Sequence, residues 1–270
     1  MRILVLIGMA TVLLGNVSLG ATEPEANTEA VDASDPTKVY TFAGAGLKYT
    51  DYTNGDGMTE VRATGNIGLS PSDMVLFELG YGWHQGDAAS EGKDDGLTNS
   101  RLRYFHLFKM DYSKMGYRGM AAQIDLQIAG ALKGTDGQNV LALGTLGAWG
   151  FTETLNFFAG PIIPSSWDKE FEQYNGTGLG ATALLVYSPH LWKGCYFQLW
   201  PSYSYFLNES LKDQGSGNLD LVAGGSFTDT LTWNITFQKN LDVDLNTYRR
   251  GRNTGLQNDW NIFASVTAYF

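Results

Sequence analysis

The sequence predicts an all-β fold, a transmembrane antiparallel up-and-down β-barrel of about 12 strands with both termini on one side. Three observations indicate this fold. Residues 259–270 alternate between two faces with the period of a β-strand. Similar strand-like stretches recur from residue 39 onward. The connections between them alternate between longer polar loops and tight turns, which is typical of membrane barrels.

The last stretch, DWNIFASVTAYF, keeps one face apolar up to its final residue. An apolar edge strand exposed to water invites aggregation, whereas a strand that faces lipid in a closed barrel does not. This strand resembles the assembly signal of Gram-negative outer-membrane β-barrels, without identifying a subfamily. The resemblance implies that Phe270 directs assembly through the barrel-assembly machinery. It also implies an outer-membrane location in contact with lipid and lipopolysaccharide, and termini on the periplasmic side.

The N-terminal region divides into two segments before the barrel at 39–270. Residues 1–21 combine a basic start, a short apolar run and small residues, which is typical of a secretory signal peptide. The run is shorter than the ~18 apolar residues of a spanning helix. Residues 22–38 are acidic and contain no aromatic residue, so we expect a flexible periplasmic segment. The alternative is a plug folded into the barrel.

Composition narrows the function classes. The whole chain has a net charge of −10, and loss of Arg2 with the signal peptide leaves 17 basic and 28 acidic residues, a net of −11. Such an acidic chain is a poor nucleic-acid binder. The single Cys195 excludes an internal disulfide. Residues 51–57 have hairpin chemistry but fail the spacing of a calcium loop, so no metal and no cofactor are expected.

Twelve strands are expected in order along the chain. Most odd-numbered connections are longer and polar, whereas most even-numbered ones are tight turns such as 152–154 and 228–230. Long loops outside and short turns in the periplasm belong to outer-membrane barrels. The expected strands are 39–49, 60–69, 74–84, 100–110, 118–132, 140–151, 155–163, 178–187, 195–207, 218–227, 231–241 and 259–270.

The alternation assigns a face to each residue. In 231–238 the odd positions are apolar and should meet lipid, whereas the even positions are polar and should line the lumen. A charged Arg or Lys facing lipid near the midplane costs ~2–4 kcal/mol, so charged strand residues should point inward. The predicted pore-lining residues are Lys48, Glu60, Arg62, Glu78, Arg101, Arg103, Lys109, Asp125 and Asp220.

These lumen charges have two interpretations, which the sequence leaves open. In the first, the basic residues form a strip on the strands 39–49, 60–69 and 100–110 that favours anions, because the arginine fork fits carboxylate or phosphate. In the second, cross-strand ion pairs such as Arg62–Glu78 or Arg103–Glu78 fill the interior and serve structure.

The opposite wall is predicted to carry apolar side chains inward. They could form a track for a ring-bearing solute. The favoured alternative is packing around a narrow neck, or a register shift at Pro161 or Pro201, where a strand loses a hydrogen bond. The residues concerned are Phe158, Ile162, Leu184, Val186, Trp200 and Phe206.

An enzymatic reading finds little support. A hydrolase needs a nucleophile, a base and an orienting group within reach of one another. The histidines are His84 at the outer rim near Asp87 and Ser90, His106 on the lipid face, and His190 in a periplasmic turn. The loop arginines Arg249, Arg250 and Arg252 and the acidic loop 85–99 are expected to be solvated.

The expected function is a porin-like outer-membrane channel for passive diffusion of small hydrophilic solutes, with a preference for anions. Sieving by the bore and electrostatics from the lumen charges would select the solute. The protein is not expected to be an enzyme. The alternatives are a closed structural or adhesion barrel, and a lipid hydrolase with its active site at the rim.

Overall fold

The structure is a computed structural model, which describes residues 31–33, 38–53, 56–86, 95–111, 114–130, 137–245 and 258–270. The signal-peptide prediction, most of 22–38, and the loop residues Asp87, Ser90 and 249–252 lie outside this part. The described residues belong to one unit, 31–270.

Twelve long strands and one short strand, β4, make up the regular structure of the described residues, together with the single-turn 3₁₀ helix η1, Glu209–Leu211. β4 is Asp95–Leu97, inside the region expected to be a loop. The long strands are β1 Phe42–Tyr52, β2 Gly57–Ser70, β3 Asp73–Gln85, β5 Ser100–Phe108, β6 Gly116–Ile128, β7 Asn139–Gly150, β8 Leu155–Trp167, β9 Tyr174–Tyr187, β10 Tyr196–Phe206, β11 Gly215–Ser226, β12 Leu231–Asp242 and β13 Asn258–Tyr269.

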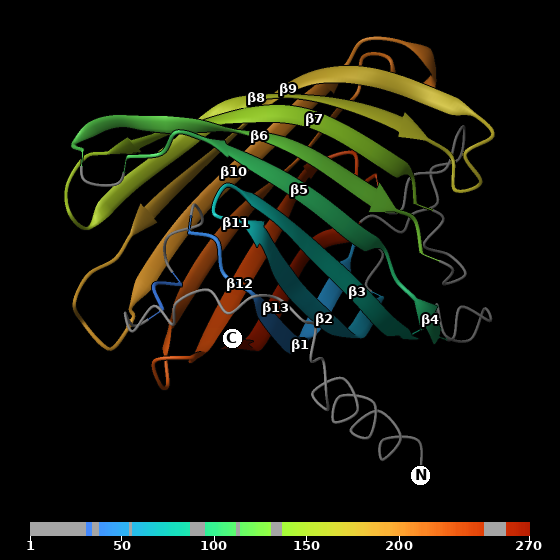
Figure 1. The fold of residues 1–270 in the computed structure, drawn as a ribbon. Helices are drawn as coiled ribbons and strands as arrows, with labels where there is room; N and C mark the ends of the chain where they lie inside the picture. Colours follow the sequence, from blue (N-terminus) through green and yellow to red (C-terminus); the bar gives the residue numbers. More distant parts are fainter. Residues whose placement is uncertain are drawn as a thin grey trace. The chain divides into compact units, whose positions relative to one another are not determined.

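The strands form a closed antiparallel barrel, as predicted (Figure 1). Each long strand pairs with its neighbours in the chain, and β1 closes the wall by pairing with β13. Closure leaves the backbone N–H and C=O groups of the wall paired with one another, which a barrel needs in order to sit in lipid. No helix in the described part of the chain is long and apolar enough to cross a membrane.

The barrel has two ends, which we name by their connections. The loop end carries the connections β1–β2, β3–β5, β6–β7, β8–β9, β10–β11 and β12–β13. The turn end carries the other connections, the start of β1 and the end of β13. Short connections such as 71–72, 151–154 and 227–230 lie at the turn end. In an outer-membrane barrel the turn end is the periplasmic side.

Several predicted strand boundaries differ from the structure, by up to four residues. β8 continues past Pro164, which had been expected to begin a loop, and the proline lies opposite Ala142 of β7. The pairing of β8 with β9 has a gap at Ile163 and Pro164, where the proline has no N–H to donate to the ladder. Neither Pro161 nor Pro201 shifts the register of its strand, so the predicted register shift is wrong.

Candidate functional site: the barrel lumen

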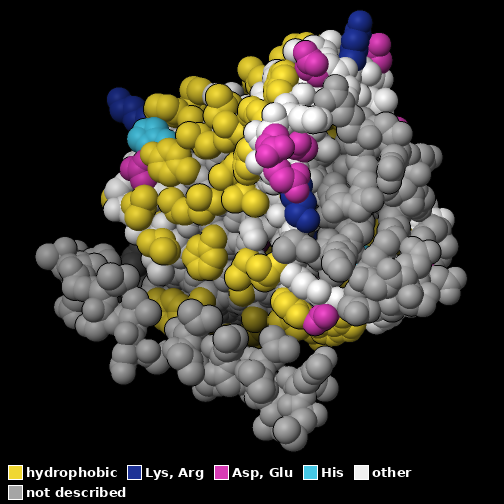
Figure 2. All heavy atoms as spheres, turned by 90° about the vertical axis from the view of Figure 1, so that its right-hand side faces the viewer, with side chains coloured by type: hydrophobic (Ala, Val, Ile, Leu, Met, Phe, Trp, Pro, Cys, Tyr) yellow, Lys and Arg dark blue, Asp and Glu magenta, His cyan; other side chains and the backbone are white. Residues whose placement is uncertain are grey.

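The outer wall of the barrel is apolar. Alternate residues of the strands expose large hydrophobic side chains, including Leu79 of β3, Leu143 of β7 and Ile235 of β12. Figure 2 shows hydrophobic side chains across much of the described surface on one side, with charged side chains mostly toward its margins. In water, proteins with such an apolar surface would aggregate, whereas in a bilayer the surface contacts the hydrocarbon chains of the lipids.

The loop-end half of the lumen encloses a polar cavity of about 370 Å³, the loop-end chamber. Side chains from both sides of the barrel line it, and most carry charge or hydrogen-bonding groups. Its charged lining comprises four basic and four acidic residues, and their charges balance: Lys48, Arg62, Arg101, Arg103, Glu78, Asp125, Asp220 and Asp244.

Arg62, Glu78 and Arg103 form one network of ion pairs with Glu60. The Arg62 guanidinium donates to Glu60, and its Nη1 donates to Glu78 Oε2 over 2.9 Å. Arg103 Nη2 donates to the other oxygen of Glu78, also over 2.9 Å. Arg62 Nη2 further reaches the Asn99 side chain at 2.9 Å. Glu60 has no exposed surface, so it supports Arg62 from behind while the other members face the chamber.

Arg101 of β5 forms a separate ion pair with Asp125 of the neighbouring strand β6. Its Nε lies 2.9 Å from Asp125 Oδ1 and its Nη2 lies 2.5 Å from Asp125 Oδ2, which is the bidentate geometry of a strong ion pair. Each of the three predicted lumen arginines therefore faces a carboxylate. The ion-pair interpretation left open by the sequence is the one that this geometry supports, and both named pairs with Glu78 are present.

Two predicted lumen charges have no ion pair with a described residue. Lys48 of β1 lines the loop-end chamber, and it takes part in none of the salt bridges among the described residues. Asp220 of β11 receives two amide donors at Oδ1, from Asn218 over 2.7 Å and from Gln238 over 2.8 Å. Its Oδ2 accepts no such bond from a described residue, so Lys48 and Asp220 are lumen charges that a solute could pair with.

Lys109 does not lie in the lumen, contrary to the prediction. The sequence placed it on a strand that ran to Met110, but β5 ends at Phe108. Lys109 follows in the turn with a φ of 39°, is exposed, and lines neither lumen chamber. A positive φ ends the strand, so the rule that successive side chains point alternately to lipid and to the lumen does not apply to Lys109.

The turn-end half of the lumen encloses a second cavity of about 350 Å³, the turn-end chamber. All twelve long strands contribute to its lining; the apolar side chains come mainly from β3, β5, β7, β8, β9 and β10, whereas β2 and β12 contribute polar ones. Phe158, Leu184 and Trp200 of the predicted apolar wall line it, whereas Ile162 and Phe206 line the loop-end chamber. Val186 is fully buried in a cluster with Ala148, Phe158 and Leu184. The sequence-level assignment of these side chains to the interior is correct.

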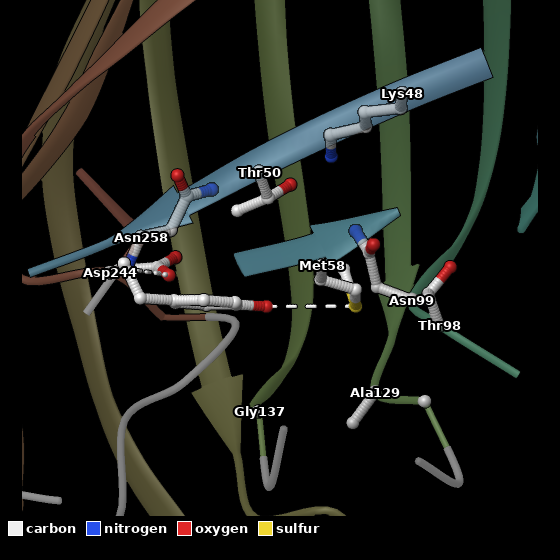
Figure 3. A pocket seen from close by; sticks show the side chains of 11 residues that line it. Lys48, Thr50, Met58, Thr98, Asn99, Ala129, Gly137, Asp244 and Asn258 are labelled. Carbon is white, nitrogen blue, oxygen red and sulfur yellow. Dashed lines mark hydrogen bonds between the residues drawn. The ribbon is translucent and has the colours of Figure 1, made fainter. Parts of the chain in front are cut away.

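A small pocket of about 30 Å³ lies at the loop end beside Lys48 (Figure 3). Lys48 and Thr50 of β1, Met58 of β2 and Asn258 of β13 contribute to it, and the Tyr52 hydroxyl donates to the Met58 sulfur over 3.6 Å. Thr50 Oγ1 and Asn258 Oδ1 are buried and have no hydrogen-bond partner among the described residues. The pocket is large enough for one or two waters.

Backbone hydrogen bonds also join separate segments of the chain at both ends of the barrel. At the loop end, Gln138 N donates to Leu245 O over 2.7 Å, which joins the β6–β7 connection to residues that follow β12. At the turn end, Val31 N donates to Asp229 O over 3.2 Å, while Asp32 and Lys38 line the turn-end chamber. Sequence reasoning did not identify Gln138 or Leu245, because loop residues carry no periodicity that reveals their partners.

Among the described residues, His106 and its neighbours do not form the hydrogen-bonded arrangement of a serine hydrolase. His84 is buried beside Tyr52, with ring centroids 5.9 Å apart. His106 Nδ1 lies 2.8 Å from Asp73 Oδ1, and Ser70 Oγ donates to the same carboxylate over 2.5 Å instead of to the histidine. A serine nucleophile needs its base within hydrogen-bond reach. Within the described residues no group of three or more His, Cys, Asp or Glu side chains is placed to hold a metal.

Comparison with known proteins gives the fold but no family. No family model and no curated protein matches the sequence. Among solved structures, an outer-membrane channel from Pseudomonas putida F1 is 12% identical, with 93% of this chain and 100% of that chain aligned at a TM-score of 0.58. The NanC porin is 10% identical over 85% of this chain and 99% of its own, at a TM-score of 0.53.

A third similar structure is an active-site variant of the outer-membrane phospholipase A from Escherichia coli. It is 12% identical over 92% of this chain and 94% of its own, at a TM-score of 0.50. The same barrel therefore occurs in channels and in an enzyme, and the fold alone does not exclude catalysis. The chain has the fold of outer-membrane β-barrel proteins, as the sequence predicted.

Proposed function

We propose that this protein is a porin-like channel of the bacterial outer membrane for passive diffusion of small hydrophilic solutes. One observation carries the proposal: a polar, charged chamber of about 370 Å³ lies inside a barrel whose outer wall is apolar. A barrel that served only as structure would gain more from a packed interior, because each chamber-facing charge costs desolvation unless solvent or a solute reaches it.

The two similar channels support this function over catalysis. The best histidine cluster, His106 with Asp73 and Ser70, lacks the serine-to-histidine hydrogen bond of a hydrolase. We therefore propose that the protein is not an enzyme. Release of fatty acid from phospholipid vesicles by purified protein, abolished in His106→Ala, would contradict this part of the proposal.

The preference for anions stays a prediction, and we expect it to be weak. Arg62, Arg101 and Arg103 all donate to carboxylates, so their fields are largely offset by their partners. The free charges Lys48 and Asp220 have opposite signs. A lumen of this kind selects chiefly by size and hydrogen bonding, with a modest ion preference.

Single-channel conductance of the purified full chain in a planar bilayer tests the proposal. A channel gives discrete current steps, and the reversal potential in a KCl gradient gives the ion preference. A closed structural barrel or a rim hydrolase gives no steps above the bare bilayer. The absence of steps from protein that is folded, as judged by heat-modifiable gel mobility, would refute the channel.

A further inference from the structure

The turn-end chamber departs from the usual interior of a membrane barrel. Inward-facing residues of such barrels are generally polar, because they meet water or a polar solute. Here inward positions of five strands carry large apolar side chains at this level: Met74 and Leu76 of β3, Phe105 and Leu107 of β5, Phe158 of β8, Leu184 of β9, and Trp200 of β10.

All of these residues pack in two clusters, but this packing does not fill the lumen. Met74, Phe105, Leu107 and Ala121 form one buried cluster with Leu76 packed against it, and Phe158 and Leu184 belong to a second one with Trp200 packed against it. Between them the chamber of about 350 Å³ remains, although well-packed interiors hold few voids larger than a water. Its volume lies within the ~300–1,000 Å³ of small-molecule pockets.

Trp200 lies at the boundary of the two chambers and lines both. Its indole N–H, the one polar group of the side chain, donates to Thr182 Oγ1 over 2.8 Å. This bond fixes the ring and satisfies its polar atom, so the apolar ring surface remains for contact with another molecule. Phe263, on β13, lines both chambers as well. Offset or edge-to-face contact with a ligand ring is favourable at such a position.

Polar groups meet this apolar surface at the same level. Asp220 is the direct cross-strand neighbour of Trp200, and its Oδ2 is open to an N–H or O–H donor. Arg103 and Glu78 also line both chambers, but they neutralise one another. The boundary therefore suits a molecule with an apolar ring and a small polar head of low net charge.

From this arrangement we infer that the turn-end chamber is a binding site for the ring of a small amphipathic solute. The polar head of the solute stays beside Asp220, at the boundary of the two chambers. The inference rests on the proposed channel function and deepens it by naming the solute class. Zwitterionic ring-bearing amino acids have this chemistry, with an ammonium group that can donate to Asp220. The solute binds there transiently as it crosses the barrel and is not trapped, because the polar loop-end chamber adjoins the site.

Phenylalanine and alanine are the probes, because they carry the same head and differ by the ring. Both are zwitterions near neutral pH and carry no net current. In single-channel recordings of the full chain, phenylalanine is expected to reduce the KCl current with a saturating concentration dependence. Alanine at the same concentrations is expected to leave the current unchanged.

Variants locate the effect. Trp200→Ala should raise the half-blocking phenylalanine concentration about two- to tenfold, the size expected for one aromatic contact. Trp200→Phe should keep it near the wild-type value. Leu199→Ala is the matched control, because Leu199 is the preceding residue of β10 and is exposed on the lipid-facing wall. Its half-blocking concentration should not change.

Three results would overturn the inference. Equal effects of phenylalanine and alanine on a conducting wild-type channel remove the ring site and leave the channel function standing. Equal loss in Trp200→Ala and Leu199→Ala removes the assignment to Trp200. A folded protein that never conducts refutes the proposed function, and the inference with it. The wild-type comparison and Trp200→Phe keep the test valid if Trp200→Ala does not fold.

Discussion

Replacing Glu78 by glutamine is expected to destabilise the barrel and to shift its ion preference toward anions. The Glu78 carboxylate accepts from Arg62 and Arg103 over 2.9 Å each, and the three side chains are only 18%, 7% and 14% exposed. Glutamine preserves the shape but removes the charge. Removing one partner of a fully buried pair costs about 3–5 kcal/mol. We expect about 2–3 kcal/mol here, because Arg62 retains Glu60 and Asn99 and the chamber is polar.

The same substitution adds one positive charge to a lining whose charges balance. At ~8 Å in a water-filled lumen, one charge changes the energy of a passing ion by ~0.5 kcal/mol. The energy falls for an anion and rises for a cation, a difference of ~1 kcal/mol, so the anion-to-cation permeability ratio should rise about fivefold in dilute salt and less at physiological salt, where screening is stronger. Urea unfolding followed by gel mobility measures the stability, and the reversal potential in a KCl gradient measures the selectivity.

Arg103→Gln and the double variant complete the test. Arg103→Gln should move the reversal potential toward cations and cost less stability, because Glu78 keeps Arg62. The double variant should return the reversal potential near wild type, and its stability loss should be smaller than the sum of the single losses. The reasoning is refuted if Glu78→Gln unfolds at the wild-type urea concentration and leaves the reversal potential unmoved.

The remaining predictions concern the wall and its assembly. Ile235→Arg on the lipid face should cost ~2–4 kcal/mol in urea unfolding from lipid vesicles, whereas Thr236→Arg in the lumen should cost less; equal costs would count against the assigned faces. In a Cys195→Ser background, a cysteine at 236 should react with a water-soluble thiol reagent and one at 235 should not, and the reverse pattern would mean a register shifted by one. Deleting Phe270 should leave heat-modifiable barrel scarce in outer-membrane fractions, and normal insertion of the truncated chain would contradict its role as an assembly signal.

The sequence by itself determined the fold class, the strand order and the face of most wall residues. These follow from local physics: successive side chains of a strand point to opposite faces, and a wall between lipid and lumen must alternate. The alternation of Ile235 with Thr236 could therefore be interpreted without a partner strand. The face of Lys109 was predicted wrongly, because side chains alternate between the two faces only within a strand and β5 ends at Phe108.

Only the tertiary structure decided which lumen charges pair and what space remains between the walls. Arg101 lies directly across from Glu78, and Arg103 lies directly across from Asp125. The observed ion pairs are the two diagonal ones, Arg101–Asp125 and Arg103–Glu78. How far each side chain reaches along the tilted strands sets these partners. The alternation of residues along a strand gives the face of a side chain but not its partner. Likewise, the sequence predicted apolar side chains on one inner wall, but only the structure shows that many of them lie at the turn end and leave a chamber between them. This space depends on the curvature of the closed wall, which no single strand specifies.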